Sequence, residues 1–81
     1  MKLFLISQTE NDKYDTYDSA IVAASHEDEA KGIHPSNDDK EWGHGTGKTW
    51  CSGPHMVVAK YIGEAAEGID RGVILASFNA G

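Results

Sequence analysis

The residues of this sequence best suited to chemistry lie between positions 42 and 54, in the stretch WGHGTGKTWCSGP. Its glycines let the backbone approach a ligand closely, its lysine supplies positive charge, its threonines supply hydroxyls, and its tryptophans offer flat apolar rings. Such a set can hold a phosphate group beside a stacked ring. The candidate ligand-binding residues are Trp42, His44, Gly45, Thr46, Gly47, Lys48, Thr49 and Trp50.

The same stretch is free of carboxylates. No Asp or Glu occurs from Trp42 to Gly63, although the chain of 81 residues carries thirteen. We therefore expect the local field to be less negative here than elsewhere, and a cleft lined by one sign of charge concentrates the opposite sign. This pattern predicts an anion site. The alternative is a glycine-rich loop without a binding role, because long loops are commonly either functional or disordered.

The letters GHGTGKT approach the phosphate-binding P-loop but do not match it. That motif, G-x-x-x-x-G-K-[ST], follows a strand and opens a helix whose N-terminus faces the phosphates. Here Gly43 and Gly47 stand one residue too close, Trp42 occupies the place of the first glycine, and WCSGP follows, which cannot begin a helix. Nucleotide hydrolysis is therefore rejected, and binding of a phosphate-bearing small molecule is retained.

The histidines and the single cysteine raise the question of a metal or thiol site. The spacing H-x6-C-x3-H across His44, Cys51 and His55 could give three zinc ligands, with a fourth from His34 or an acid. It lacks, however, the closely paired ligands of structural zinc sites. Cys51 beside either neighbouring histidine could form a nucleophilic pair, yet a lone cysteine next to a tryptophan is typical of apolar packing. We expect no enzyme, no metal and no cofactor.

The hydrophobic pattern predicts the elements that would position this loop. Short apolar runs bounded by turn residues are typical of strands, and a capped segment before a proline is typical of a helix. Strands are predicted at residues 2–7, 19–24, 55–62 and 72–78, and a helix at about residues 26–33. The prediction is a single α+β domain over residues 1–81. It has a four-stranded, mainly antiparallel sheet in the order β-β-α-β-β, one short helix, and a long Gly/Trp-rich loop before the third strand.

Finer signals predict where the helix begins and which way the strands face. Ser25 followed by Asp28 resembles a capping box, and Gly32 with Pro35 ends the helix. In the third strand, alternation places Val57, Ala59 and Tyr61 opposite Val58, Lys60 and Ile62. In the fourth strand, it places Ile74, Ala76 and Phe78 opposite Val73, Leu75 and Ser77.

Three of the predicted strands, the first, second and fourth, are apolar on both faces. One short helix covers little of a sheet, so a second face needs another cover. The sequence therefore predicts a homodimer or a larger homo-oligomer.

Charge and cysteine content limit the partners. The net charge of −6, with only seven Lys and Arg, argues against direct binding of nucleic acid. One cysteine allows no internal disulfide, and we recognise neither a signal peptide nor an apolar stretch long enough for a membrane span. The expected location is the cytoplasm, without a membrane partner.

The segments YDTYDSAIVAASHEDEAKGIHP, residues 14–35, and ASFNAG, residues 76–81, resemble a group of small uncharacterised bacteriophage accessory proteins. The resemblance covers both ends and not the loop. It implies a protein acting in the cytoplasm of an infected bacterium, where such proteins often inhibit host enzymes or bind host immune signals. No site residue is carried over from it.

Two functions are consistent with these observations. The first is a non-catalytic binder that sequesters a phosphate-bearing, nucleotide-like host signal, with Lys48 on the phosphate and a tryptophan stacked on the base. The second is an acidic inhibitor that docks on a host enzyme through residues 10–18 and 27–41.

Overall fold

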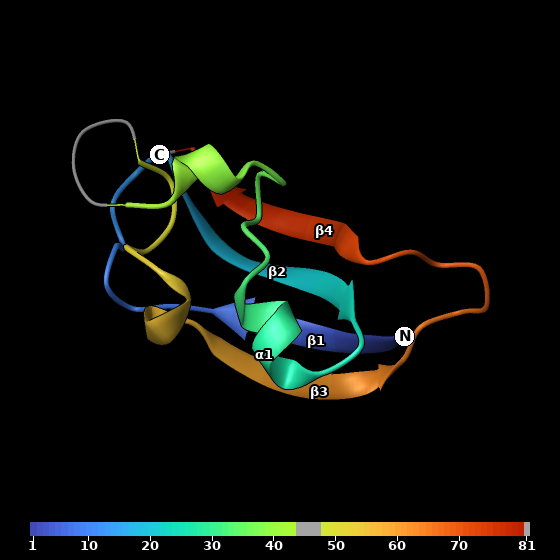
Figure 1. Ribbon diagram of the computed structural model, residues 1–81. Helices are drawn as coiled ribbons and strands as arrows, with labels where there is room; N and C mark the ends of the chain where they lie inside the picture. Colours follow the sequence, from blue (N-terminus) through green and yellow to red (C-terminus); the bar gives the residue numbers. More distant parts are fainter. Residues whose placement is uncertain (44–47, 81) are drawn as a thin grey trace.

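A four-stranded antiparallel sheet with one short helix forms the frame of the molecule (Figure 1). The computed structural model describes residues 1–43 and 48–80. In chain order its elements are β1 (Lys2–Ser7), β2 (Thr16–Ala24), α1 (Glu27–Lys31), η1 (Asp39–Glu41), η2 (Pro54–Met56), β3 (Val58–Glu64) and β4 (Gly72–Asn79). The α+β fold and the β-β-α-β-β order predicted from the sequence are confirmed.

The strands lie in the order β3-β1-β2-β4, and every neighbouring pair is antiparallel. The hairpin of β1 and β2 therefore occupies the centre, and β3 and β4 form the two edges. β1 has the predicted bounds, whereas β2 begins three residues earlier than predicted, at Thr16, which is buried and pairs with Asn79. The second central strand thus extends further into the polar connection than its composition indicates.

The third strand begins at Val58 rather than at residue 55. Pro54 opens the 3-10 turn η2, in which the amides of Met56 and Val57 donate to the carbonyls of Gly53 and Pro54. The fixed φ of proline favours such a turn and disfavours a central strand position. His55 therefore lies in the turn and not in the sheet.

The core lies on one side of the sheet only. Buried side chains of β1 and β2, such as Phe4, Ile6 and Val22, pack beneath α1 and the segment that follows it, which supplies Ala30 and Ile33. The long connection before β3 completes this core with Trp50, Cys51 and Val57. A stretch that looks like a surface loop in the sequence therefore contributes to the interior.

The helix cap is shifted by one residue from its predicted position. His26, rather than Ser25, is the N-cap, because its Nδ1 accepts from the amide of Glu29 at 3.2 Å. The carboxylate of Glu29 reaches back to the amide of Ser25 at 2.9 Å and to its hydroxyl at 3.1 Å. These hydrogen bonds lower the pKa of Glu29. The reciprocal pattern of a capping box is present, but Glu29 occupies the position that was assigned to Asp28.

Irregularities in strand pairing correct one of the predicted strand faces. In β4, Val73 pairs with Val22 and Leu75 pairs with Ile21, so Ile74 is the extra residue of a bulge. Val73 therefore turns to the core side, where it packs against the buried cluster. The prediction that Val73 shares a face with Leu75 and Ser77 is wrong, because alternation along a strand breaks at a bulge.

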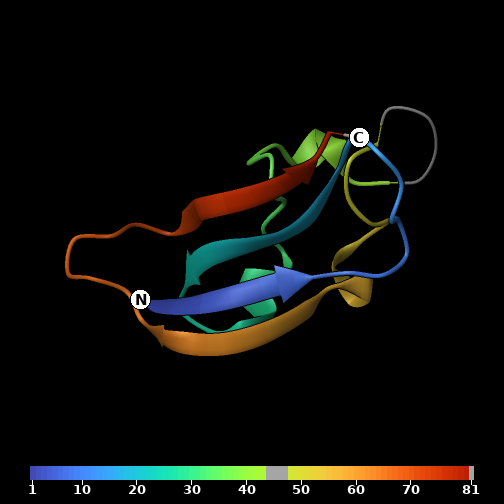
Figure 2. The same cartoon turned by 180° about the vertical axis from the view of Figure 1, so that it is seen from behind.

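The opposite side of the sheet carries no helix. Figure 2 shows β1, β2, β3 and β4 in front, with α1 and the turns η1 and η2 behind them. Of the helices in residues 1–43 and 48–80, none has the length and apolar character that crossing a membrane requires.

Candidate functional site

The candidate residues lie at the end of the sheet where β1 ends and β2 begins (Figure 1). We call this region the loop end; it comprises residues 8–15, 34–43 and 48–57. Both views place these three segments together at that end. His44, Gly45, Thr46 and Gly47 of the predicted site lie outside the described residues.

Hydrogen bonds from the β1–β2 connection fix residues 48–52. The side-chain amide of Asn11 donates to the carbonyl of Trp50 at 3.1 Å. The carboxylate of Glu10 accepts from the amide and the hydroxyl of Ser52, at 2.6 and 3.1 Å. The amide of Tyr17 donates to the carbonyl of Thr49 at 2.8 Å. This half of the glycine-rich connection is therefore held by residues some 40 positions away in the chain.

Trp50 does not face solvent. Its exposed fraction is 0%, and it is the largest fully buried side chain among the described residues. It packs with Cys51 and Val57 in the core cluster. The hypothesis that Trp50 stacks on a ligand base is therefore not supported by its position, because an indole enclosed on both faces leaves no room for a second ring.

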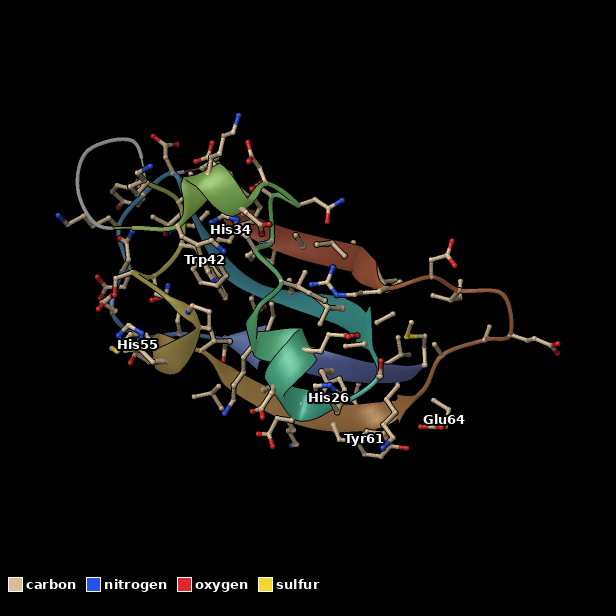
Figure 3. All side chains as sticks on the ribbon, in the orientation of Figure 1. His26, His34, Trp42, His55, Tyr61 and Glu64 are labelled. Atoms are coloured by element: carbon tan, nitrogen blue, oxygen red, sulfur yellow. The ribbon has the colours of Figure 1, made fainter. Side chains whose placement is uncertain are left out.

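Trp42 occupies a different environment. It is half-buried, packs against the core cluster, and meets the ring of His34 at a right angle with centroids 5.2 Å apart. Figure 3 labels both side chains at the loop end. His34 also lies edge-on to Trp50 at 6.5 Å and to Tyr17 at 6.2 Å. Of the two predicted stacking residues, only Trp42 presents part of its ring to solvent.

His34 is a buried, neutral histidine. It is 1% exposed, and its Nδ1 accepts from the amide of Ser36 at 3.0 Å. Burial lowers the pKa of His34, although the nearby carboxylates of Glu41, Asp38 and Asp39 act in the opposite direction. A neutral ring whose Nδ1 accepts must carry its hydrogen on Nε2. The Nε2 atom of His34 is therefore a hydrogen-bond donor.

Three buried polar atoms at the loop end have no hydrogen-bond partner within residues 1–43 and 48–80. They are His34 Nε2, Trp50 Nε1 and Thr49 Oγ1. Nε2 and Nε1 are donors, and a buried donor without an acceptor costs about 1–3 kcal/mol. Buried polar groups in native proteins nearly always have partners. The loop end therefore has an unmet demand for hydrogen-bond acceptors.

Lys48 lies close to the other described residues of the predicted site. Its Nζ donates to the carbonyl of Lys40 at 3.2 Å, and its side chain passes near Gly43. Gly43 has a φ of 133°, a conformation that favours glycine. The ammonium group is therefore paired with a neutral carbonyl rather than with an acid, and it can exchange that carbonyl for an anion at small cost.

The less negative field expected around this stretch stays a prediction, because acids from elsewhere in the chain lie beside it. Glu10 lies against Ser52, and the carboxylates of Asp38, Asp39 and Glu41 are close enough to act on His34. Residues 42–63 lack acids in the sequence, but acids from outside that range lie beside them in space. The negative charge of an anion bound at the loop end must therefore be balanced by Lys48 and by N–H donors.

The metal and thiol sites considered from the sequence include His44, which lies outside the described residues. Burial raises the pKa of the Cys51 thiol, which opposes formation of the nucleophilic thiolate. The Nδ1 of His26 is engaged as a helix cap, and His55 lies exposed in η2. Within the part of the chain that the structure describes, no three His, Cys, Asp or Glu residues come together as a metal site.

Sequence reasoning missed the roles of three residues that matter here: Glu10, Asn11 and His34. Glu10 and Asn11 stand in a polar stretch that reads as an ordinary turn, and no sequence pattern connects them to residues 48–52. His34 carried one signal, the Pro35 that follows it and ends the helix, but this gives no indication of burial.

Comparisons with protein families, with curated proteins and with solved structures found no match to this chain.

Proposed function

We propose that this protein is a non-catalytic binder of a phosphate-bearing, nucleotide-like small molecule at the loop end. The observation that supports it is the buried donor His34 Nε2, which has no hydrogen-bond acceptor at full geometry within the described residues, although the backbone of Glu41 is close enough to act on its pKa. Phosphate and base oxygens are acceptors, and charge-assisted hydrogen bonds to phosphate are stronger than neutral ones.

The proposal assigns a separate role to each described residue of the site. Lys48 leaves the carbonyl of Lys40 and binds the phosphate. Its ammonium group supplies the positive charge that an anion needs beside the surrounding carboxylates. Trp42, the half-buried ring against His34, moves outward and stacks on the base. Stacking of one base on an aromatic ring contributes about 1–3 kcal/mol. His34 then donates from Nε2 to the ligand. Trp50 supports His34 from inside the core.

Thermal unfolding in the presence of matched nucleosides, nucleotides and cyclic nucleotides tests this function. A ligand present at about one hundred times its Kd stabilises the folded state by about 2.7 kcal/mol, which raises the Tm of a domain this small by roughly 10 °C or more. We expect a nucleotide to raise the Tm and its parent nucleoside to raise it less. No rise with any member of the panel would contradict the proposal.

Variants locate the site by titration calorimetry. Lys48→Met keeps the aliphatic stem and removes the charge, and Trp42→Ala removes the stacking ring. We expect each to weaken nucleotide binding at least about tenfold, which corresponds to about 1.4 kcal/mol. Lys13→Met, on the exposed β1–β2 connection, is the matched control and is expected to bind normally. Equal losses for Lys48→Met and Lys13→Met would exclude Lys48 as the phosphate contact.

A second candidate function is supported by the distribution of acids. Acids occur in residues 10–15 and 38–41, two segments distant in the sequence that Figure 1 places together at the loop end. An acidic surface of this kind suits docking on a basic host enzyme, with salt-sensitive association. Paired replacement of Asp38 and Asp39 by Asn separates the two functions, because it should weaken docking while leaving nucleotide binding unchanged or stronger.

A further inference from the structure

The uncovered side of the sheet is apolar over most of its area. We call it the open face; strand pairing and alternation from the buried Phe4 and Ile6 place its residues opposite the core. Its apolar members are Leu3, Leu5, Ile21, Val58, Ile62 and Leu75. Leu75, on the edge strand β4, is 66% exposed, and Val58, at the start of the edge strand β3, is 63% exposed.

The open face is organised in rows that cross the strands. One row runs Lys60, Leu5, Ile21 and Leu75, from β3 to β4. The next row, toward the loop end, runs Val58, Ser7, Ser19 and Ser77. Leucine, isoleucine, valine and serine side chains are short, so the surface is flat enough for a second sheet to pack on it.

Two charged side chains stand on opposite halves of this face. Lys60 lies on β3 at one edge. Asp18, the extra residue of a bulge in β2, lies near the other edge, where its carboxylate is 3.5 Å from the hydroxyl of Ser77 on β4. The serine row and the leucine row are two residues apart, about 7 Å along the strands. A lysine side chain can span most of that distance.

We propose that the occupant of the open face is a second copy of this chain, related by a two-fold axis that runs parallel to the strands. That axis places β3 of one protomer over β4 of its partner, so that each Lys60 lies on the same half of the interface as the partner's Asp18, which stands one strand further in, on β2. A two-fold axis running across the strands would place β3 over β3 and bring the two lysines together, which is unfavourable. The charge pattern therefore selects one of the two arrangements.

The size of the face sets the expected affinity. Four strands about 4.8 Å apart and about seven residues long cover roughly 19 by 23 Å, or roughly 440 Å² in projection. This is within the range of the largest apolar patches of monomers, roughly 300–600 Å², and below the roughly 800 Å² per partner of a standard interface. The dimer should therefore dissociate on dilution.

Sedimentation equilibrium from about 1 µM to about 1 mM, the range of weak complexes, tests the proposal. We expect the mass to rise with concentration from 8.8 kDa to twice that value. Leu75→Asp places a charge at the β4 end of the leucine row, and we expect it to weaken dimerisation at least about tenfold. Ile69→Asp, in the β3–β4 connection, is 39% exposed and serves as the matched control.

Each outcome decides the proposal. A mass of 8.8 kDa at every concentration overturns it, as does a dimer that persists in Leu75→Asp protein. Because Leu75 is largely exposed, the variant should keep its far-UV circular dichroism spectrum. If it does not fold, the charge exchange described next carries the test.

Exchange of the edge charges tests the direction of the axis. Lys60→Glu and Asp18→Lys should each weaken the dimer by about two- to fivefold, as expected for an exposed ion pair. The two changes together should restore the affinity. A tighter dimer for Lys60→Met alone, which removes the charge from both protomers, would show that lysines face each other and would overturn the proposed arrangement. Unchanged affinity in both single variants would overturn it as well. Neither outcome depends on whether the loop end binds a nucleotide.

Discussion

The connection between α1 and β3 has two arms that each carry one tryptophan and one glycine but lie in opposite environments. The first arm, residues 36–43, carries Trp42, which is half-buried, and exposed acids such as Asp38 and Asp39. The second arm, residues 48–53, carries Trp50, which is fully enclosed. Hydrogen bonds from Glu10, Asn11 and Tyr17 hold the second arm. The difference teaches that glycines and tryptophans do not decide whether a segment is core or surface; its long-range partners do.

The largest expected contrast between the arms comes from truncating each tryptophan. Trp50→Ala should lower the free energy of unfolding by about 3–5 kcal/mol, because it removes a large ring from a closed core. Trp42→Ala should cost less, about 1–2 kcal/mol, because part of that ring already contacts solvent. Urea unfolding followed by circular dichroism measures both. Loss of the cooperative unfolding transition in Trp50→Ala protein also agrees with the prediction, because the total free energy of unfolding of a domain this small is only about 4–12 kcal/mol.

Equal losses for the two tryptophan variants would contradict the assignment of the arms. Trp50→Phe serves as a control for ring size, and it should cost less than Trp50→Ala because an aromatic ring still fills most of the site.

A smaller contrast separates two acids of the β1–β2 connection that look alike in the sequence. Glu10 binds both the amide and the hydroxyl of Ser52, whereas Asp12 is exposed. Glu10→Ala should lower the free energy of unfolding by about 1.5–3 kcal/mol, the value for hydrogen bonds to a charged group. Asp12→Ala should change it by less than about 0.5 kcal/mol, as most exposed substitutions do. Similar values in urea unfolding would show that the second arm does not depend on Glu10.

Much of the fold follows from short-range sequence patterns. The bounds of β1, the hairpin with β2, the position of β4 and the presence of a short helix near residue 27 all come from alternation, turn residues and capping signals. The position of β3 was shifted by Pro54, whose turn is itself a local effect. The bulge at Ile74 was missed, because residues 72–78 alternate evenly and only pairing with β2 reveals the extra residue.

The candidate site was less predictable because it depends on contacts between distant segments. Residues 42–63 contain no acid, but acids from other parts of the chain, Glu10 and Glu41, lie beside them in the folded protein. The burial of Trp50 depends on the two arms folding onto the sheet, and no pattern within the loop encodes it. The burial of His34 is of the same kind.

The smallest expected effect concerns the histidine that lies between the two arms. Burial lowers the pKa of His34 in the folded chain below the ordinary value of 6.5, so the unfolded chain binds a proton at a higher pH than the folded chain does. Protonation therefore favours unfolding: the contribution of His34 is complete above about pH 6.5 and is lost as the pH falls from there through the folded pKa. One proton limits the slope to about 1.4 kcal/mol per pH unit.

Urea unfolding of wild-type and His34→Gln protein at about pH 7.5, 6.5 and 5.5 measures this slope. These pH values span the ordinary histidine pKa of about 6.5. We expect wild-type stability to fall over this range and that of His34→Gln to fall less, whatever its stability at neutral pH. His55→Gln, in the exposed turn η2, is the control and should keep the wild-type slope. If His34→Gln keeps the full slope, the pH dependence belongs to another group and His34 is not the buried neutral donor on which the proposed site depends. If the slope disappears, the folded core selects the neutral ring of His34. Because Nδ1 accepts from the amide of Ser36, that ring carries its hydrogen on Nε2 and is able to donate to an acceptor on a ligand.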